Sequence, residues 1–193
     1  MKDCFICSPE HYQSEPVQAY IRQKSRERDK QWIFDLIKIA SDSESSLHQH
    51  EILRINSLRN HEIIHINTPE WMLCRDVHPG HDTRYLVVFK NRTLRTIRDL
   101  DRRHVAMLRD IQTQVAGFMA RHHSESRPKF RCFFHYMPSV YQLHVHISSH
   151  ILPLNSLRRH YMAQVIDNIE KQSSYYTNAL MLISKPLYHS ERK

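Results

Sequence analysis

The residues with the clearest chemical potential form the segment from Gln142 to Ser148, in which polar and apolar side chains alternate. Successive side chains of an extended strand point to opposite faces, so His144 and His146 share one face and the apolar residues that alternate with them face the core. Two imidazoles side by side on a strand suit nucleophilic phosphoryl chemistry or metal binding, and they also fit a solvated face without a chemical role. The spacing therefore predicts a strand with two reactive side chains and leaves three uses for them.

A second group of potential metal ligands stands at the start of the chain, where Cys4 and Cys7 form a CxxC pattern with His11 nearby. A structural zinc site needs four ligands, and no second CxxC follows. Distant histidines could complete such a site, but we predict neither a metal nor another cofactor. Cys74 and Cys132 stand alone, and no apolar run long enough for a signal peptide precedes any cysteine. We therefore expect a reducing compartment, the cytosol or the nucleus.

The composition indicates one globular domain with an affinity for anions. The chain has 193 residues, of which 40% are hydrophobic, enough for a sizeable core. Its 28 lysines and arginines exceed its 20 aspartates and glutamates, giving a formal charge of +8 that favours phosphate-rich partners. A merely basic protein without such a partner also fits, because the charges are spread along the chain. With Gly80 and Gly117 as its only glycines, the chain has no Walker or Rossmann phosphate loop.

Hydrophobic periodicity predicts helices and strands in a mixed order. One helix begins at Ser14, carries Pro16 in its first turn and continues to about Ile37. Another follows the capping residue Asp101, with apolar residues at helical spacing. The remaining expected elements are strands at Glu51–Leu58, His61–Ile66, Trp71–Cys74, Tyr85–Phe89, Phe130–Tyr136, Leu143–Ile147 and Ala179–Ile183, and a third helix at about Ser156–Gln172. We therefore predict an α+β fold with a mainly antiparallel sheet and flanking helices.

The sequence from His135 to His146, His-Tyr-Met-Pro-Ser-Val-Tyr-Gln-Leu-His-Val-His, resembles the active-site hairpin of the histidine-triad superfamily. It is most similar to the branch of scavenger mRNA-decapping enzymes, which remove m7G from cap remnants. The superfamily motif is His-φ-His-φ-His-φ-φ, where φ is apolar. Its second and third histidines correspond to His144 and His146, and Gln142 stands in place of the first. Met162–Glu170 also resembles the family's helix after the motif. The resemblance implies a histidine-triad fold and a homodimer.

Upstream segments extend the resemblance. Thr96–Leu100 is similar to the family's segment before the hairpin, and the stretch around Trp32 is similar to that of the tryptophan that stacks on the methylated guanine. Glu51 and Asp76 correspond to the family's two acids that contact the cap. The resemblance runs from about Val17 to the C-terminus and covers only the C-terminal catalytic domain of the metazoan enzymes.

This coverage implies a domain organisation. We expect residues 16–193 to form the catalytic domain, without the N-terminal swapped domain that closes over the cap in the relatives. Residues 1–15 then form an N-terminal arm, or a lid that takes over part of that task.

The resemblance also implies a role for each matching side chain. His144 attacks the phosphorus next to m7G and forms a covalent nucleotidyl-imidazole, with no metal. The side chains implied in phosphate binding are His135, Ser139, His146, Gln142 and His78. Those implied in binding the base are Trp32, Glu51 and Asp76. Since N7-methylguanine is cationic, a tryptophan adds cation–π attraction to stacking, and the two acids accept hydrogen bonds from the base.

The implied partner is a capped dinucleotide, m7GpppN, or a short capped RNA, and we expect neither membrane nor DNA binding. Three positions depart from the family pattern: Gln142 replaces a histidine, Val140 a tyrosine and His78 a lysine. Two other functions therefore stay open. His144 could act on other nucleotide anhydrides or phosphoramidates, or the protein could bind caps or RNA ends without turnover.

Overall fold

The computed structural model describes residues 5–42, 64–76, 84–122, 130–148 and 158–183. Its centre is a six-stranded antiparallel sheet with the order β2-β3-β4-β6-β5-β7, and a two-stranded ribbon pairs β1 with β8. The strands are β1 (Phe5–Cys7), β2 (Ile64–Asn67), β3 (Trp71–Arg75), β4 (Arg84–Phe89), β5 (Arg131–His135), β6 (His144–Ser148), β7 (Arg159–Tyr161) and β8 (Met181–Ile183). The predicted α+β class with a mainly antiparallel sheet is confirmed.

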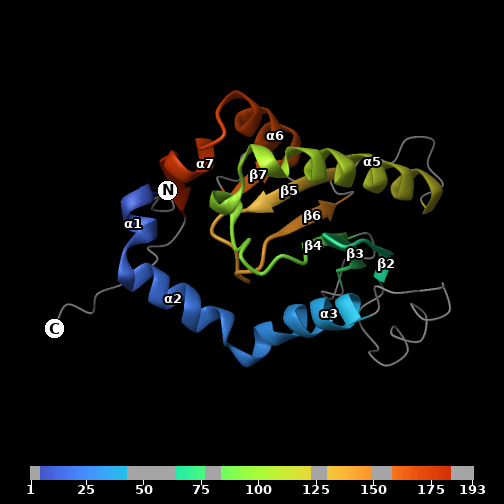
Figure 1. Ribbon diagram of the computed structural model, residues 1–193, viewed down its shortest axis with the longest axis horizontal. Helices are drawn as coiled ribbons and strands as arrows, with labels where there is room; N and C mark the ends of the chain where they lie inside the picture. The colour runs from blue at the N-terminus through green and yellow to red at the C-terminus, as the bar shows by residue number, and fades with distance from the viewer. Residues whose placement is uncertain (1–4, 43–63, 77–83, 123–129, 149–157, 184–193) are drawn as a thin grey trace.

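Helices cover both faces of the sheet (Figure 1). The α-helices are α1 (Pro9–Gln13), α2 (Glu15–Ser25), α3 (Gln31–Asp42), α5 (Val105–His122), α6 (Met162–Lys171) and α7 (Tyr175–Asn178), and the 3-10 helices are η1 (Arg28–Lys30), η2 (Ile97–Asp99) and η3 (Arg102–His104). No helix within the described ranges has the length and apolar content needed to span a bilayer.

The strand register decides which side chains share a face. In the antiparallel pair of β4 and β6, Val88 lies opposite His144 and Leu86 lies opposite His146, so these four side chains project to the same side. That side is covered by α3, whose apolar residues pack with Leu86 and Val88 in one cluster. The other side, which includes Val145, packs against α5 and α6 in the larger core. The alternation expected for this strand is confirmed.

The larger core confirms the predicted periodicity of the second helix. The buried residues of α5 are Leu108, Ile111, Val115, Phe118 and Met119. They recur at intervals of three and four residues and so form one stripe along the helix. Cys7 and Tyr12, from the N-terminal segment, are buried in the same core. The N-terminal segment therefore packs on the domain through these side chains, and its role as a lid stays a prediction.

The first helix differs from its prediction, because the stretch from Ser14 to Ile37 is broken into α2, η1 and α3. The residues between Lys24 and Lys30 are all polar or charged, so a continuous helix would have no apolar face there. Gln31 stabilises the break by donating from Nε2 to the carbonyl oxygens of Ser25 and Glu27, at 2.9 and 3.3 Å. The two halves pack separately, α2 on the larger core and α3 on the smaller one.

Strand pairing also overrides the prediction at the C-terminal end. The helix expected from Ser156 begins only at Met162, because Arg159–Tyr161 pairs with β5 as β7. The last strand forms as expected within Ala179–Ile183, but it joins β1 instead of the main sheet. The strand expected at Glu51–Leu58 lies outside the described residues.

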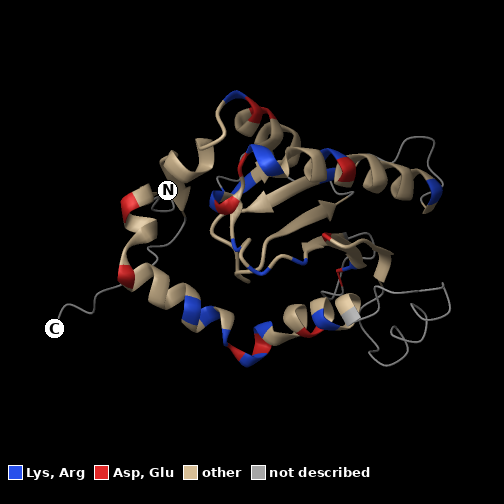
Figure 2. Cartoon of the chain, in the orientation of Figure 1, with Lys and Arg blue, Asp and Glu red and all other residues tan. Residues whose placement is uncertain are grey.

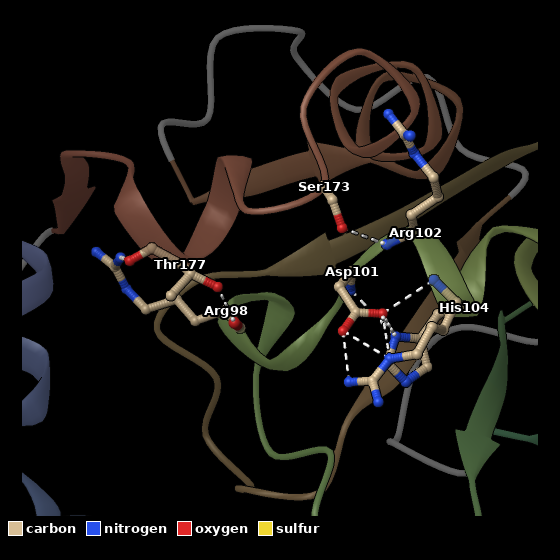
Figure 3. A network of polar contacts seen from close by, with 7 residues as sticks. Arg98, Asp101, Arg102, His104, Ser173 and Thr177 are labelled. Atoms are coloured by element: carbon tan, nitrogen blue, oxygen red, sulfur yellow. Dashed lines mark hydrogen bonds and ion pairs between the residues drawn. The ribbon is translucent and has the colours of Figure 1, made fainter.

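A polar network ties the segment before α5 to the C-terminal helices (Figure 3). The Thr177 hydroxyl donates to the carbonyl oxygen of Arg98 at 3.2 Å, and the backbone N–H of Arg102 donates to the Ser173 hydroxyl at 3.1 Å. Asp101 caps η3 by accepting from the backbone N–H of Arg103 at 2.9 Å. Segments far apart in the sequence are thereby held together on the side of the sheet that α5 and α6 cover.

Candidate active site

Three imidazoles lie next to one another on the side of the sheet that α3 covers. The rings of His144 and His146 have centroids 4.9 Å apart, and His135, at the end of β5, lies 4.3 Å from His146. Phe133, opposite His146 in the register, is stacked with that ring at 5.5 Å. Because strand pairing fixes the backbone beneath them, the sheet itself positions the three histidines. All three are among the site residues that the sequence analysis selected.

His144 is held in one tautomer by the backbone next to it. Its Nδ1 lies 2.8 Å from the carbonyl oxygen of Gln142, and because a carbonyl oxygen only accepts, Nδ1 carries the proton. Nε2 therefore keeps its lone pair in the neutral ring. Burial lowers the pKa of His144, while the hydrogen bond to Gln142 and the charge of Asp76 act in the opposite direction. At neutral pH the side chain is therefore uncharged, and its free lone pair lies on Nε2.

Gln142 is fully buried and directs its amide into the protein. Nε2 donates to the carbonyl oxygens of Phe89 and Asn91, at 2.6 and 3.1 Å. These bonds engage both N–H groups of the amide, so neither is left for a phosphate oxygen, in contrast to the contact expected from the sequence. Gln142 instead joins the end of β4 to the start of β6, and its own carbonyl holds His144. The amide Oε1 finds no hydrogen-bond donor among the described residues.

The residues expected to bind the base lie partly within the described ranges. Trp32 is on α3, partly buried against the smaller core, on the same side of the sheet as the histidines. Asp76 is buried directly after β3, and its charge acts on His144. Glu51 and His78 lie outside the described residues. The structure therefore brings Trp32 and Asp76 to the face of the sheet that carries His144 or to its edge.

The loop between β5 and β6 carries Ser139, whose side chain is exposed. Its start is fixed from both sides. The Tyr136 hydroxyl accepts a hydrogen bond from Arg98 Nε at 2.7 Å, and the Arg158 guanidinium donates to the carbonyl oxygen of Met137 at 2.9 Å. Its end is fixed by Val140, which is buried in the smaller core. The loop thus presents Ser139 from an anchored backbone.

Arg159 lies beside the candidate site and was not among the residues predicted from the sequence. It lies opposite His135 in the pairing of β5 and β7, and its guanidinium lies 5.4 Å from the ring centroid of Phe133. A basic side chain is thereby placed beside the row of imidazoles. Assigning this stretch to a helix concealed the position. Arg159–Tyr161 is three residues long and does not alternate apolar and polar residues, so no local pattern marked it as a strand.

The N-terminal cysteines are only partly described. Cys7 is buried, with its Sγ 3.8 Å from the carbonyl oxygen of Ser8 and 3.5 Å from the Tyr136 hydroxyl, whereas Cys4 lies outside the described residues. Within the described ranges, no group of three or more His, Cys, Asp or Glu side chains has an arrangement suited to a metal ion.

The chain matches the family "Scavenger mRNA decapping enzyme C-term binding" over residues 31–162. Curated relatives include m7GpppX diphosphatases. Those of Bos taurus and Homo sapiens are 31% and 32% identical over 99 residues, which are 49% of this chain and 29% of each relative. That of Schizosaccharomyces pombe is 38% identical over 52 residues, or 27% of this chain and 17% of the relative. The chain thus matches less than a third of the length of these relatives.

Two solved structures of Hnt3 are among those that the chain matches. The complex of Hnt3 with DNA and guanosine has a TM-score of 0.43 and 18% identity, and covers 64% of this chain and 79% of that one. The crystal structure of the aprataxin ortholog Hnt3 from Schizosaccharomyces pombe has a TM-score of 0.43 and 16% identity, and covers 70% of this chain and 80% of that one.

Proposed function

Because the chain belongs to the scavenger mRNA decapping enzyme family, through the family's C-terminal domain, we propose that it hydrolyses the triphosphate bridge of m7GpppN or of short capped RNA. The observation that carries the proposal is the state of His144, a buried neutral imidazole whose Nδ1–H is fixed by a carbonyl oxygen. It lies in contact with a second imidazole and on the same side of the sheet as Trp32. One side of the sheet thus carries the residues that we propose as the nucleophile, the phosphate-holding group and the aromatic ring for the base.

The reaction proceeds in two steps. The lone pair of His144 Nε2 forms a bond to the α-phosphorus next to m7G, and the bond from that phosphorus to the bridging oxygen breaks, releasing a nucleoside diphosphate. The ring becomes cationic, because Nδ1 keeps its proton. The carbonyl oxygen of Gln142 and the charge of Asp76 both favour that cation, as their effects on the pKa of His144 indicate. Water then cleaves the phosphorus–nitrogen bond and releases m7GMP.

The groups beside His144 stabilise the charge that develops on phosphate. His146 and His135 donate hydrogen bonds to the non-bridging oxygens, and the Ser139 hydroxyl contributes from the loop. Arg159 adds a positive charge at the far end of the row, where its place opposite His135 supports this role. Gln142 acts indirectly, by holding the backbone that orients His144.

The base is bound on the α3 side. Trp32 stacks on the cationic m7G ring, and Asp76 and Glu51 accept hydrogen bonds from its N–H groups. His78 contacts the phosphates from the segment after β3. A neutral guanine gains less from this arrangement, so the site discriminates by the charge of the base.

Chromatography of the products tests the reaction. Wild-type protein incubated with m7GpppG should yield m7GMP and GDP, and His144→Asn should yield neither. His122→Asn, at an exposed position on α5, is a matched control that should keep full activity.

Two outcomes would replace the proposal. Cleavage of a diadenosine polyphosphate with m7GpppG left intact would make the protein a hydrolase of other nucleotide anhydrides. Tight binding of m7GTP with no product over hours would make it a cap-binding protein without turnover.

The homodimer and the location are further proposals. Within the described residues, β7 pairs with β5 alone and ends the order of the six-stranded sheet, and a strand in that position can pair with a second copy. Light scattering at micromolar concentration should give twice the mass of 23.2 kDa. Because capped fragments arise where mRNA is degraded, a fluorescent fusion should lie in the cytosol, the nucleus or both.

A further inference from the structure

A basic pocket lies beside the candidate active site. It has a volume of about 450 Å³ and is formed by α2, by the start of α3 and by the chain that follows β4. Four of its lining residues are arginines, two are aromatic and none is acidic: Arg22, Arg26, Arg92, Arg95, Phe34 and Tyr141. Figure 2 shows basic positions along α2 and in the chain after β4.

Most of this positive charge is not neutralised within the described part of the protein. Arg22 forms an ion pair with Glu15. Arg95 instead donates to the uncharged amide oxygen of Gln18 at 3.2 Å, and the Arg92 guanidinium lies over the ring of Phe34 at 4.8 Å. Among the described residues, no carboxylate forms an ion pair with Arg26, Arg92 or Arg95. Like charges held together are stabilised by a bound anion, so the pocket favours a phosphate-rich ligand.

The pocket adjoins the site through the backbone. Tyr141, in its wall, directly precedes Gln142, and Arg92 directly follows Asn91, whose carbonyl oxygen accepts from the Gln142 amide. On α3, Phe34 lies in the pocket two residues after Trp32. The pocket and the candidate site therefore share helix α3 and the segment that leads into β6.

We propose that this pocket binds the phosphates of the RNA chain that continues beyond the capped nucleotide. The inference rests on the proposed function and extends it, because it makes a capped oligonucleotide a better ligand than the cap dinucleotide. Single-stranded nucleic acid is bound by positively charged grooves in which bases stack on aromatic rings or guanidinium planes. Arg92, whose guanidinium lies over the Phe34 ring, offers such a plane, and Arg26 and Arg95 supply charge beside it.

The test compares ligands of increasing length. Binding to the His144→Asn protein, which prevents turnover, is measured for m7GpppG and for m7GpppG extended by four and by eight nucleotides, at several salt concentrations. Affinity should rise at least tenfold with the tail. In Arg26→Gln/Arg92→Gln the tail should add little, and the slope of log K against log salt should fall by about 1.4, since each phosphate contact on a single strand contributes about 0.7.

A control keeps the net charge matched. Arg109→Gln/Arg121→Gln removes the same two charges from α5, across the sheet from α3, and should keep the gain from the tail. The proposal is overturned if the tail adds nothing in the parent protein, if both double variants lose the gain equally, or if Arg26→Gln/Arg92→Gln weakens m7GpppG as much as the extended ligands.

An uncapped RNA octamer separates this proposal from the proposed function. If wild-type protein leaves m7GpppG intact but binds the octamer through Arg26 and Arg92, the enzyme assignment fails and the pocket stands. If m7GpppG is cleaved but neither the tail nor the octamer depends on these arginines, the pocket fails alone.

Discussion

Replacing Gln142 with leucine tests whether its amide serves the scaffold. The substitution removes the donors of two hydrogen bonds, at 2.6 and 3.1 Å, to the carbonyl oxygens of Phe89 and Asn91. Each lost bond costs about 1 kcal/mol, and a carbonyl oxygen left buried without a donor costs roughly 1 to 3 kcal/mol. Removing Oε1, which has no donor among the described residues, returns about 1 kcal/mol. We expect Gln142→Leu to lower the free energy of unfolding by roughly 2 to 4 kcal/mol.

Urea denaturation followed by tryptophan fluorescence measures this change. Gln164→Leu, on the exposed face of α6, is the matched control and should change stability by less than about 0.5 kcal/mol. Gln142→His should lie between the two, because a neutral imidazole has a single N–H and keeps one of the two bonds. If Gln142→Leu unfolds at the same urea concentration as the wild type, the amide does not join β4 to β6 as described.

Three further predictions concern the binding of the m7G base, the stability of the protein at acid pH and a buried arginine. Trp32→Ala should raise KM for m7GpppG about tenfold with little change in kcat, because it removes the cation–π attraction, and steady-state kinetics that show an equal change for a diadenosine polyphosphate would contradict this. Burial lowers the pKa of His144, and it lowers the pKa of His160 to about 4. Below pH 6.5, the ordinary pKa of histidine, the unfolded state therefore binds more protons than the folded state, and the free energy of unfolding falls as the pH falls. His160→Gln should flatten this fall between pH 6.5 and 4 in urea titrations, and an unchanged slope would exclude His160 as its source. Arg98 is buried, and its guanidinium donates to the Tyr136 hydroxyl and to the carbonyl oxygens of Cys7, Tyr176 and Thr177. Arg98→Lys, which cannot reproduce that planar fork, should cost roughly 3 kcal/mol in urea denaturation, and a loss below about 1 kcal/mol would show that the fork is dispensable.

Much of the fold could be predicted because its signals are local. The buried stripe of α5 and the strand of His144 follow from spacings of three to four residues and of two, which depend on the backbone alone. The break before Gln31 was less accessible, because it reflects two separate cores that receive α2 and α3. The strand at Arg159 forms because β5 offers it an edge, and that edge is distant in sequence.

The sequence by itself determined which residues have the chemistry of a phosphoryl-transfer site. His144 and His146 share a face because side chains alternate along any strand, and the family resemblance selected His135 and Trp32 as companions. Only the tertiary structure decided what each residue faces. Strand register brought Arg159 to the end of the row, and packing turned the Gln142 amide inward to the carbonyl oxygens of β4 and the following residues. Such contacts join residues far apart in the chain, so no local pattern encodes them.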